Sequence, residues 1–113
     1  MDQLSAAIMV KALDGLSARA AATSQNIANA QTAGYRPARV SFEAALAAAA
    51  SRGPGAVEAV QPEVRYDPAA ESAGVRLDQE LATAASTALR YGAIVEMLGR
   101  QLQLQSLAAT GGR

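Results

Sequence analysis

The chain has 113 residues with ten basic and ten acidic side chains, half of its residues are hydrophobic, and it contains neither histidine nor cysteine. A chain of this length forms one domain, and its balanced charge excludes the basic patch typical of nucleic-acid-binding proteins. Without cysteine there is no disulfide framework. No run approaches the roughly 18 apolar residues of a membrane-spanning helix, so we expect no direct membrane insertion.

The hydrophobic content overstates the core that the chain can build, because 29 of its residues are alanine. A buried CH₂ group stabilises a protein by about 0.8 kcal/mol, so an alanine-rich surface gains little on burial. We therefore expect a marginally stable monomer that needs partner subunits. The sequence also lacks a nucleophile motif, a phosphate-binding loop and metal-ligand spacing, so we expect neither an enzyme nor a cofactor or metal.

The first segment predicts a long helix over residues 3–33, within an N-terminal region of residues 1–34. Its apolar residues recur at steps of three or four, which places them on one side of a helix. The largest of them are Leu4, Ile8, Leu16 and Ile27. Gly34 is suited to the left-handed conformation that closes a helix end. No signal peptide is recognisable at the N-terminus, so export would need another route.

Two asparagines near the end of this helix, Asn26 and Asn29, are three residues apart and lie on one face. Asparagine is a poor residue inside a helix because its amide competes with the backbone for hydrogen bonds. The pair either hydrogen-bonds a neighbouring backbone or subunit, or is solvated at a fraying helix end. The sequence leaves both alternatives open.

The stretch around these asparagines resembles the N-terminal motif of the flagellar basal-body rod and hook family, which reads close to A-N-N-[IL]-A-N-x-x-T-x-G-[YF]-[KR]. The matching residues are Asn26, Ile27, Ala28, Asn29, Thr32, Gly34, Tyr35 and Arg36. Gln25 replaces the first Asn of the motif, and Ala33 replaces a common Pro. The resemblance implies that this motif takes part in assembly.

Residues 35–76 form a region rich in proline and glycine, which we expect to be a small irregular or extended segment. A short helix is predicted near residues 42–51, with Ser41 as its N-cap and an end at Gly53. Val60, Val64 and Tyr66 follow an alternating pattern of extended chain. Pro62 limits that stretch to an edge strand.

The last segment predicts a second long helix over residues 77–110, whose apolar residues recur at steps of four and three. They are Leu77, Leu81, Ala84, Ala88, Tyr91, Val95, Leu98 and Leu102. Such spacing is typical of the seam of a coiled coil. Asp78 is the expected N-cap, with Glu80 near the positive end of the helix dipole. We expect Tyr91 to fill space on the seam, while Arg90 either binds a carboxylate of another subunit or is solvated.

Two runs of this helix region extend the family resemblance. Residues 75–81 followed by Ala88-Leu89-Arg90-Tyr91 are similar to the end of proximal-rod members, and Arg76 departs from the Asp or Asn common there. The resemblance covers about residues 3–46 and 75–107. It implies a place in the periplasmic part of the basal body, reached through the flagellar export channel.

The two long helices are expected to form an antiparallel coiled-coil hairpin, giving a mainly all-α fold. Additional apolar residues would then gather at one end of the hairpin, where other subunits must cover them. They are Met9, Val10, Leu13, Ile94, Met97, Leu104 and Leu107. Assembly is therefore a better expectation than catalysis.

The resemblance implies a structural subunit of the flagellar rod, which assembles through its terminal helices and transmits torque. Its implied partners are copies of itself, other rod proteins, the junction protein between the MS ring and the rod, and the export gate. A second hypothesis is a soluble coiled-coil adaptor or export chaperone in the cytosol. It accounts for the heptads equally well but leaves the motif of residues 26–36 unexplained.

Overall fold

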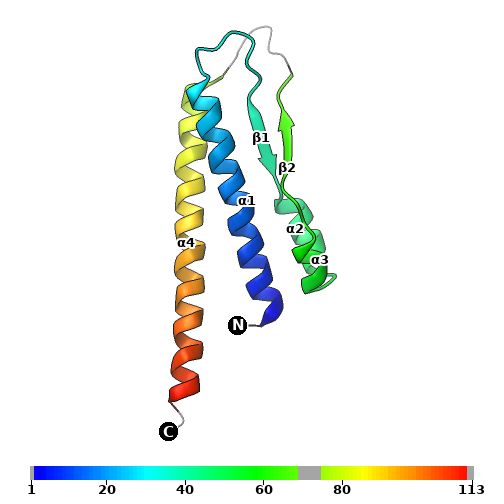
Figure 1. Ribbon diagram of the computed structural model, residues 1–113, viewed down its shortest axis with the longest axis vertical. Coiled ribbons are helices and arrows are strands. Elements are labelled where there is room, and N and C mark those ends of the chain that lie inside the picture. The colour runs from blue at the N-terminus through cyan, green and yellow to red at the C-terminus, as the bar shows by residue number, and fades with distance from the viewer. Residues whose placement is uncertain (1, 69–74, 112–113) are drawn as a thin grey trace.

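The computed structural model describes residues 2–68 and 75–111 of the chain. The elements in chain order are α1 (Gln3–Ala28), β1 (Ala38–Ser41), α2 (Glu43–Ala50), α3 (Pro54–Glu58), β2 (Glu63–Tyr66) and α4 (Leu77–Thr110). The fold is mostly helical with two long terminal helices, as predicted, and a small two-stranded sheet lies between them in the sequence (Figure 1).

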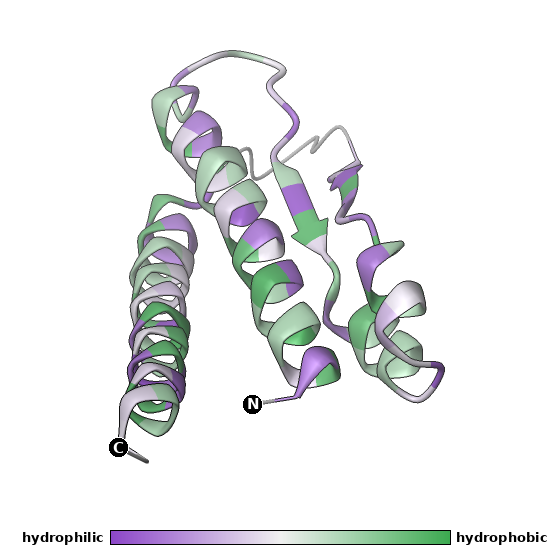
Figure 2. Ribbon diagram, turned by 60° about the horizontal axis from the view of Figure 1, so that its bottom comes forward, coloured by the Kyte–Doolittle hydropathy of each residue, from purple (hydrophilic) through white to green (hydrophobic). Residues whose placement is uncertain are grey.

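The elements lie in a single layer. α1 occupies the middle, with α4 on one side and the strands and short helices on the other, and a turned view preserves this order (Figure 1, Figure 2). The molecule measures 66 × 27 × 13 Å, and its radius of gyration is 17.8 Å. A compact domain of this length has a radius of gyration of about 13 Å and is usually built from two packed layers. Both broad faces of this layer are therefore uncovered.

Both ends of α1 are set by polar side chains. Asp2 is the N-cap, and its Oδ1 accepts a hydrogen bond from the Ser5 N–H at 2.7 Å. The helix ends at Ala28, earlier than predicted, because Asn29 takes the C-cap position and its side chain donates to the Gln25 carbonyl at 2.9 Å. The chain then turns, and Gly34 adopts a left-handed φ of +74° six residues beyond the helix end.

The middle segment is more regular than expected. β1 and β2 pair antiparallel, with Ala38 opposite Tyr66 and Ser41 opposite Glu63. The expectation that Ser41 caps the short helix is wrong: Ser41 belongs to β1, and Phe42 holds the N-cap position of α2 without a side-chain bond. Helix α3 was not predicted.

Most of the core comes from this middle segment. The buried hydrophobic residues are Leu16, Ala22, Ala38, Val40, Phe42, Leu46, Ala49 and Val57. Only Leu16 and Ala22 belong to α1, and α4 contributes none of them. Gly15 makes the central contact possible, because a Cβ there would lie 2.5 Å from Phe42 Cγ and Cε1. The segment expected to be irregular is thus the main packing partner of α1.

α4 runs antiparallel along α1 (Figure 1), but the residues that it buries are not those that the sequence predicts. The side of α4 toward the protein, here called the inner line, holds its buried and half-buried residues. They are Glu80, Thr83, Thr87, Ile94, Leu98 and Gln101, and Ala84 lies beside them. Of these, only Glu80 and Thr87 are buried.

Most of the predicted seam is exposed, although Ala88 and Tyr91 line the groove between α1 and α4. The exposed seam residues, here called the outer stripe, are Leu77, Leu81, Ala88, Tyr91, Val95 and Leu102. The exposed fractions are 54% for Leu81, 47% for Val95 and 62% for Leu102. The expectation that all of them pack on α1 is wrong, whereas Ala84 and Leu98 of the seam are half-buried. In α1 the predicted seam residue Leu16 is buried, and Leu4, Ile8 and Ile27 are half-buried.

Candidate functional site: a buried polar junction

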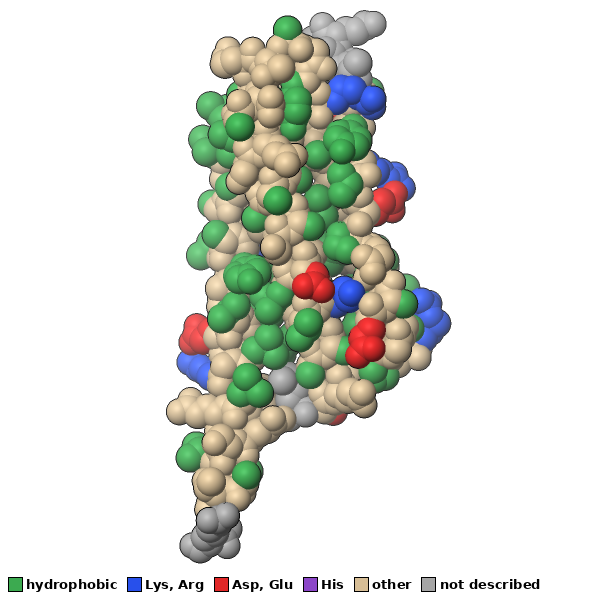
Figure 3. All heavy atoms as spheres, viewed as in Figure 1, with side chains coloured by type: hydrophobic (Ala, Val, Ile, Leu, Met, Phe, Trp, Pro, Cys, Tyr) green, Lys and Arg blue, Asp and Glu red, His purple; other side chains and the backbone are tan. Residues whose placement is uncertain are grey.

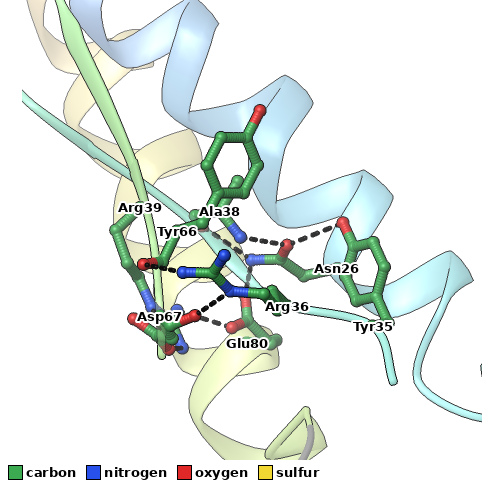
Figure 4. Close-up of polar contacts among 8 residues, drawn as sticks. All are labelled: Asn26, Tyr35, Arg36, Ala38, Arg39, Tyr66, Asp67 and Glu80. Carbon is green, nitrogen blue, oxygen red and sulfur yellow. Dashed lines mark hydrogen bonds and ion pairs between the residues drawn. The ribbon is translucent and has the colours of Figure 1, made fainter. Parts of the chain in front are cut away.

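Asn26 lies at the centre of a polar junction between α1, β1 and α4 (Figure 4). Its side chain is fully buried and makes four hydrogen bonds. Nδ2 donates to the Ala38 carbonyl at 2.9 Å and to Glu80 Oε2 at 3.1 Å. Oδ1 accepts from the Ala38 N–H at 2.9 Å and from the Tyr35 hydroxyl at 3.1 Å. Both donors and both acceptor positions of the amide are therefore in use.

Two side chains of α1 cover the open edge of β1. The Pro37 carbonyl accepts from Asp67 N–H at 2.9 Å, so the next pair, Ala38 with Tyr66, points its backbone groups away from the partner strand. Asn26 pairs with the Ala38 groups as a third strand would. Two residues further along, Arg19 donates to the Val40 carbonyl at 2.7 Å. This edge is thereby closed to pairing with another strand.

Glu80 connects α4 to this junction and is completely buried. Its Oε1 accepts from Arg39 Nη1 at 2.6 Å, while the Arg39 Nε and Nη2 donate to Asp67 Oδ2 at 3.2 and 3.0 Å. Burial opposes the charge of Arg39, but the hydrogen bonds to Asp67 and Glu80 outweigh it and raise the pKa of the guanidinium. One arginine of β1 therefore holds two carboxylates that come from different elements.

A second ionic contact, around Glu43, joins α1, α2 and α4. The Arg19 guanidinium lies 5.0 Å from the Phe42 ring centroid and donates to both oxygens of Glu43 at 2.7 Å. The hydrogen bonds from Arg19 lower the pKa of Glu43 to about 2. Arg90 of α4 lies 3.6 Å from the same carboxylate. Neither alternative expected for Arg90 describes this contact, because the carboxylate belongs to its own chain and the Arg90 side chain is still 61% exposed.

The family-like motif divides between this junction and a local turn. Asn26 and Tyr35 belong to the junction, whereas the Thr32 hydroxyl donates to Asn29 Oδ1 at 3.1 Å within the turn. Arg36 Nε donates to the Asp67 carbonyl at 2.7 Å, which fastens the turn to the end of β2. Ile27 is half-buried, and Ala28 and Gly34 are exposed.

Sequence reasoning missed the charged members of the junction. Arg39 is 28 residues from Asp67 and 41 from Glu80, so no local pattern joins them. Asp78, the expected N-cap, lies in the first turn of α4, where Arg76 has the cap position. Glu80 was assigned only a dipole role. A signal was available in principle, since Glu80 lies next to the apolar positions of the helix, where an unpaired charge is unfavourable.

The hydrogen bonds of the junction join α4 to α1 and β1. Among the described residues, every buried polar side-chain atom has a hydrogen-bond partner, and no cluster of acidic side chains could hold a metal ion. No helix in the described part of the chain is long and apolar enough to cross a membrane. A groove of about 440 Å³ remains between α1 and α4, lined mostly by small residues such as Ala20, Ala84 and Gly92.

No protein-family model matches the sequence, and no curated protein matches it significantly. The resemblance to the rod and hook family therefore depends on the motifs of residues 26–36 and 75–91.

Proposed function

We propose that this protein is a structural subunit of the bacterial flagellar rod, with its motifs most similar to those of the proximal-rod protein FlgB. Copies would assemble through α1 and α4, which run antiparallel to each other. The partners would be other rod proteins, the junction protein at the MS ring and the export gate, in the periplasmic part of the basal body. The rod would transmit torque as a stiff bundle.

The observation that carries the proposal is the uncovered apolar surface of a one-layer fold. The large apolar residues that remain exposed lie mostly on α4: Leu77, Leu81, Leu89, Tyr91, Val95, Met97, Leu102, Leu104 and Leu107. Hydrophobic side chains extend along one face of the molecule with few charged groups among them (Figure 3). A large exposed apolar patch is typical of an interaction surface.

The total surface supports the same proposal. The chain exposes 7308 Å², whereas a compact monomer of its mass exposes about 5800 Å². The excess, about 1500 Å², is nearly twice the roughly 800 Å² that one partner buries in a standard-size protein interface. Neighbouring copies on the faces of the layer would supply the second layer that the fold lacks.

Mass spectrometry of hook-basal bodies purified from the native cell tests the proposal. We expect this chain at a few copies per particle and at constant stoichiometry to other rod proteins. Its absence from intact rods would contradict a rod subunit and favour the cytosolic adaptor or chaperone.

Leu102→Asp tests the role of α4 directly. Leu102 is exposed, so the variant should fold as well as the wild type but fail to enter rods, and the cells should not swim. Gln103→Asp is the matched control on the same exposed turn and should support swimming. Leu98→Asp is less specific because Leu98 is half-buried beside α1. Normal swimming with Leu102→Asp would count against assembly through this surface.

A further inference from the structure

α4 presents its less apolar side to the rest of the protein. The inner line contains Glu80, Thr83, Thr87 and Gln101, and only Ile94 and Leu98 are large and apolar. The outer stripe, with its leucines, Val95 and Tyr91, is exposed. Successive residues of a helix are about 100° apart, so the mean directions of the two lines differ by a rotation of roughly 90° about the helix axis. Burial of apolar area alone would favour the rotation that seats the outer stripe on α1.

The polar junction opposes that rotation. Glu80 accepts hydrogen bonds from Asn26 at 3.1 Å and from Arg39 at 2.6 Å, and neither donor belongs to α4. Turning the outer stripe inward would withdraw the carboxylate from both donors. It would leave the buried amide of Asn26 with an unused N–H and Arg39 without one of its two carboxylates. Unpaired buried polar groups are strongly unfavourable, more so when charged.

We propose that Glu80 is a positioning residue that sets the rotation of α4, so that the outer stripe stays at the surface of the folded monomer. Buried ionic groups serve best as devices that specify one register over another. Glu80 selects between two faces of α4 in the same way, and the face that it turns inward is the less apolar one. This assignment concerns the fold of the single chain and is independent of the proposed place in the rod.

Single cysteines can report the rotation, because the chain has no cysteine of its own. We would introduce Val95→Cys on the outer stripe and, separately, Ile94→Cys on the inner line, and measure the rate of maleimide labelling. In the wild-type background Val95→Cys should react faster, since Val95 is 47% exposed and Ile94 is half-buried. Glu80→Ala should slow labelling at residue 95 and speed it at residue 94, changing the ratio of the two rates by roughly fivefold or more.

The control is Asp78→Ala, which removes an exposed carboxylate of the same helix, far from residues 94 and 95, and should leave the ratio unchanged. Far-UV circular dichroism establishes that each variant is folded. Should Glu80→Ala unfold, Glu80→Gln decides on the same ratio, because it loses the charge opposite Arg39 and should shift the ratio by roughly twofold.

Two outcomes would overturn the proposal. An unchanged ratio in a folded Glu80 variant would mean that the rotation is set elsewhere. Fast labelling at both residue 94 and residue 95 would mean that Glu80 holds α4 onto the protein without choosing its face.

Discussion

The molecule has two regions that are stabilised in different ways. In the first region, α1 packs on the strands and short helices around a buried apolar cluster that includes Phe42, Leu46 and Val57. The stability of this region therefore comes from apolar burial. In the second, α4 contributes no buried apolar residue and is held by Glu80, Thr87 and several half-buried contacts. Length and hydrophobic periodicity alone do not determine which helix carries the core. The longest helix can contribute the least to the apolar core when most of its large apolar residues are exposed.

The strongest way to break this comparison is to remove the apolar centre. Phe42→Ala should destabilise the protein by about 3–5 kcal/mol, because it leaves a cavity between α1 and α2 and removes the ring beneath Arg19. Urea unfolding followed by circular dichroism measures the loss. Leu89→Ala on α4, where the side chain is 76% exposed, is the control and should change stability by less than about 0.5 kcal/mol. Similar effects of the two substitutions would contradict the division into two regions.

Removing the polar anchor should have the next largest effect. Asn26→Ala leaves the backbone groups of Ala38 and one oxygen of Glu80 without their partner, which we expect to cost about 2–3 kcal/mol. Asn29→Ala, which removes two exposed local hydrogen bonds, to the Gln25 carbonyl and from the Thr32 hydroxyl, should cost about 1 kcal/mol or less. Hydrogen exchange would show loss of protection first in the N-terminal half of α4. Equal costs for the two asparagines would refute a special role of Asn26.

Two glycine-to-alanine substitutions, one in each region, test the difference in packing with a single added methyl group. Gly15→Ala drives a Cβ into the Phe42 ring and should destabilise by about 1–3 kcal/mol. Gly92→Ala in α4 meets no atom within 4 Å and should stabilise by up to about 1 kcal/mol through helix propensity. Thermal unfolding should move in opposite directions for the two variants. A gain from Gly15→Ala would mean that the packing around Phe42 is loose.

The smallest expected effect is a dependence on pH. The pKa of Glu43 is lowered from 4.5 to about 2 by hydrogen bonds from Arg19. Its contribution to stability is therefore complete above about pH 5 and is lost as the pH falls toward 2. Since the Glu43 side chain is 48% exposed, solvent screening keeps this contribution below about 1 kcal/mol. Urea midpoints at several pH values should show a smaller acid loss for Glu43→Gln than for the wild type, and no such change for Glu96→Gln.

The two long helices could be predicted from the sequence because each has an unbroken periodicity and no internal proline. The strand near Val64 was also indicated by alternation. Its partner strand was not, because residues 38–41 carry no pattern that predicts a strand or its register with β2. The core around Phe42 was missed because the surrounding segment is rich in proline and glycine. Those residues mark turns but do not exclude packing between the turns.

The rotation of α4 was predicted wrongly for a physical reason. Hydrophobic spacing identified the better apolar face, and a single charged residue, Glu80, reverses the choice through contacts with Asn26 and Arg39. Such contacts join residues that are far apart in the sequence, so periodicity could not reveal them. For Asn26 and Asn29 the sequence left open whether the amides bond a neighbouring backbone or are solvated. Asn26 bonds the backbone of Ala38, whereas Asn29 bonds within its own turn, and only the fold separates the two.

The unequal lengths of the terminal helices have a geometric consequence. At about 1.5 Å per residue, the 34 residues of α4 span about 51 Å and the 26 of α1 about 39 Å, and α4 extends past the start of α1 (Figure 1). In the proposed rod, copies of this shape would not meet end to end at a flat joint. Each would overlap its neighbour along the sides of the helices, so a twisting load would be carried by shear between helices.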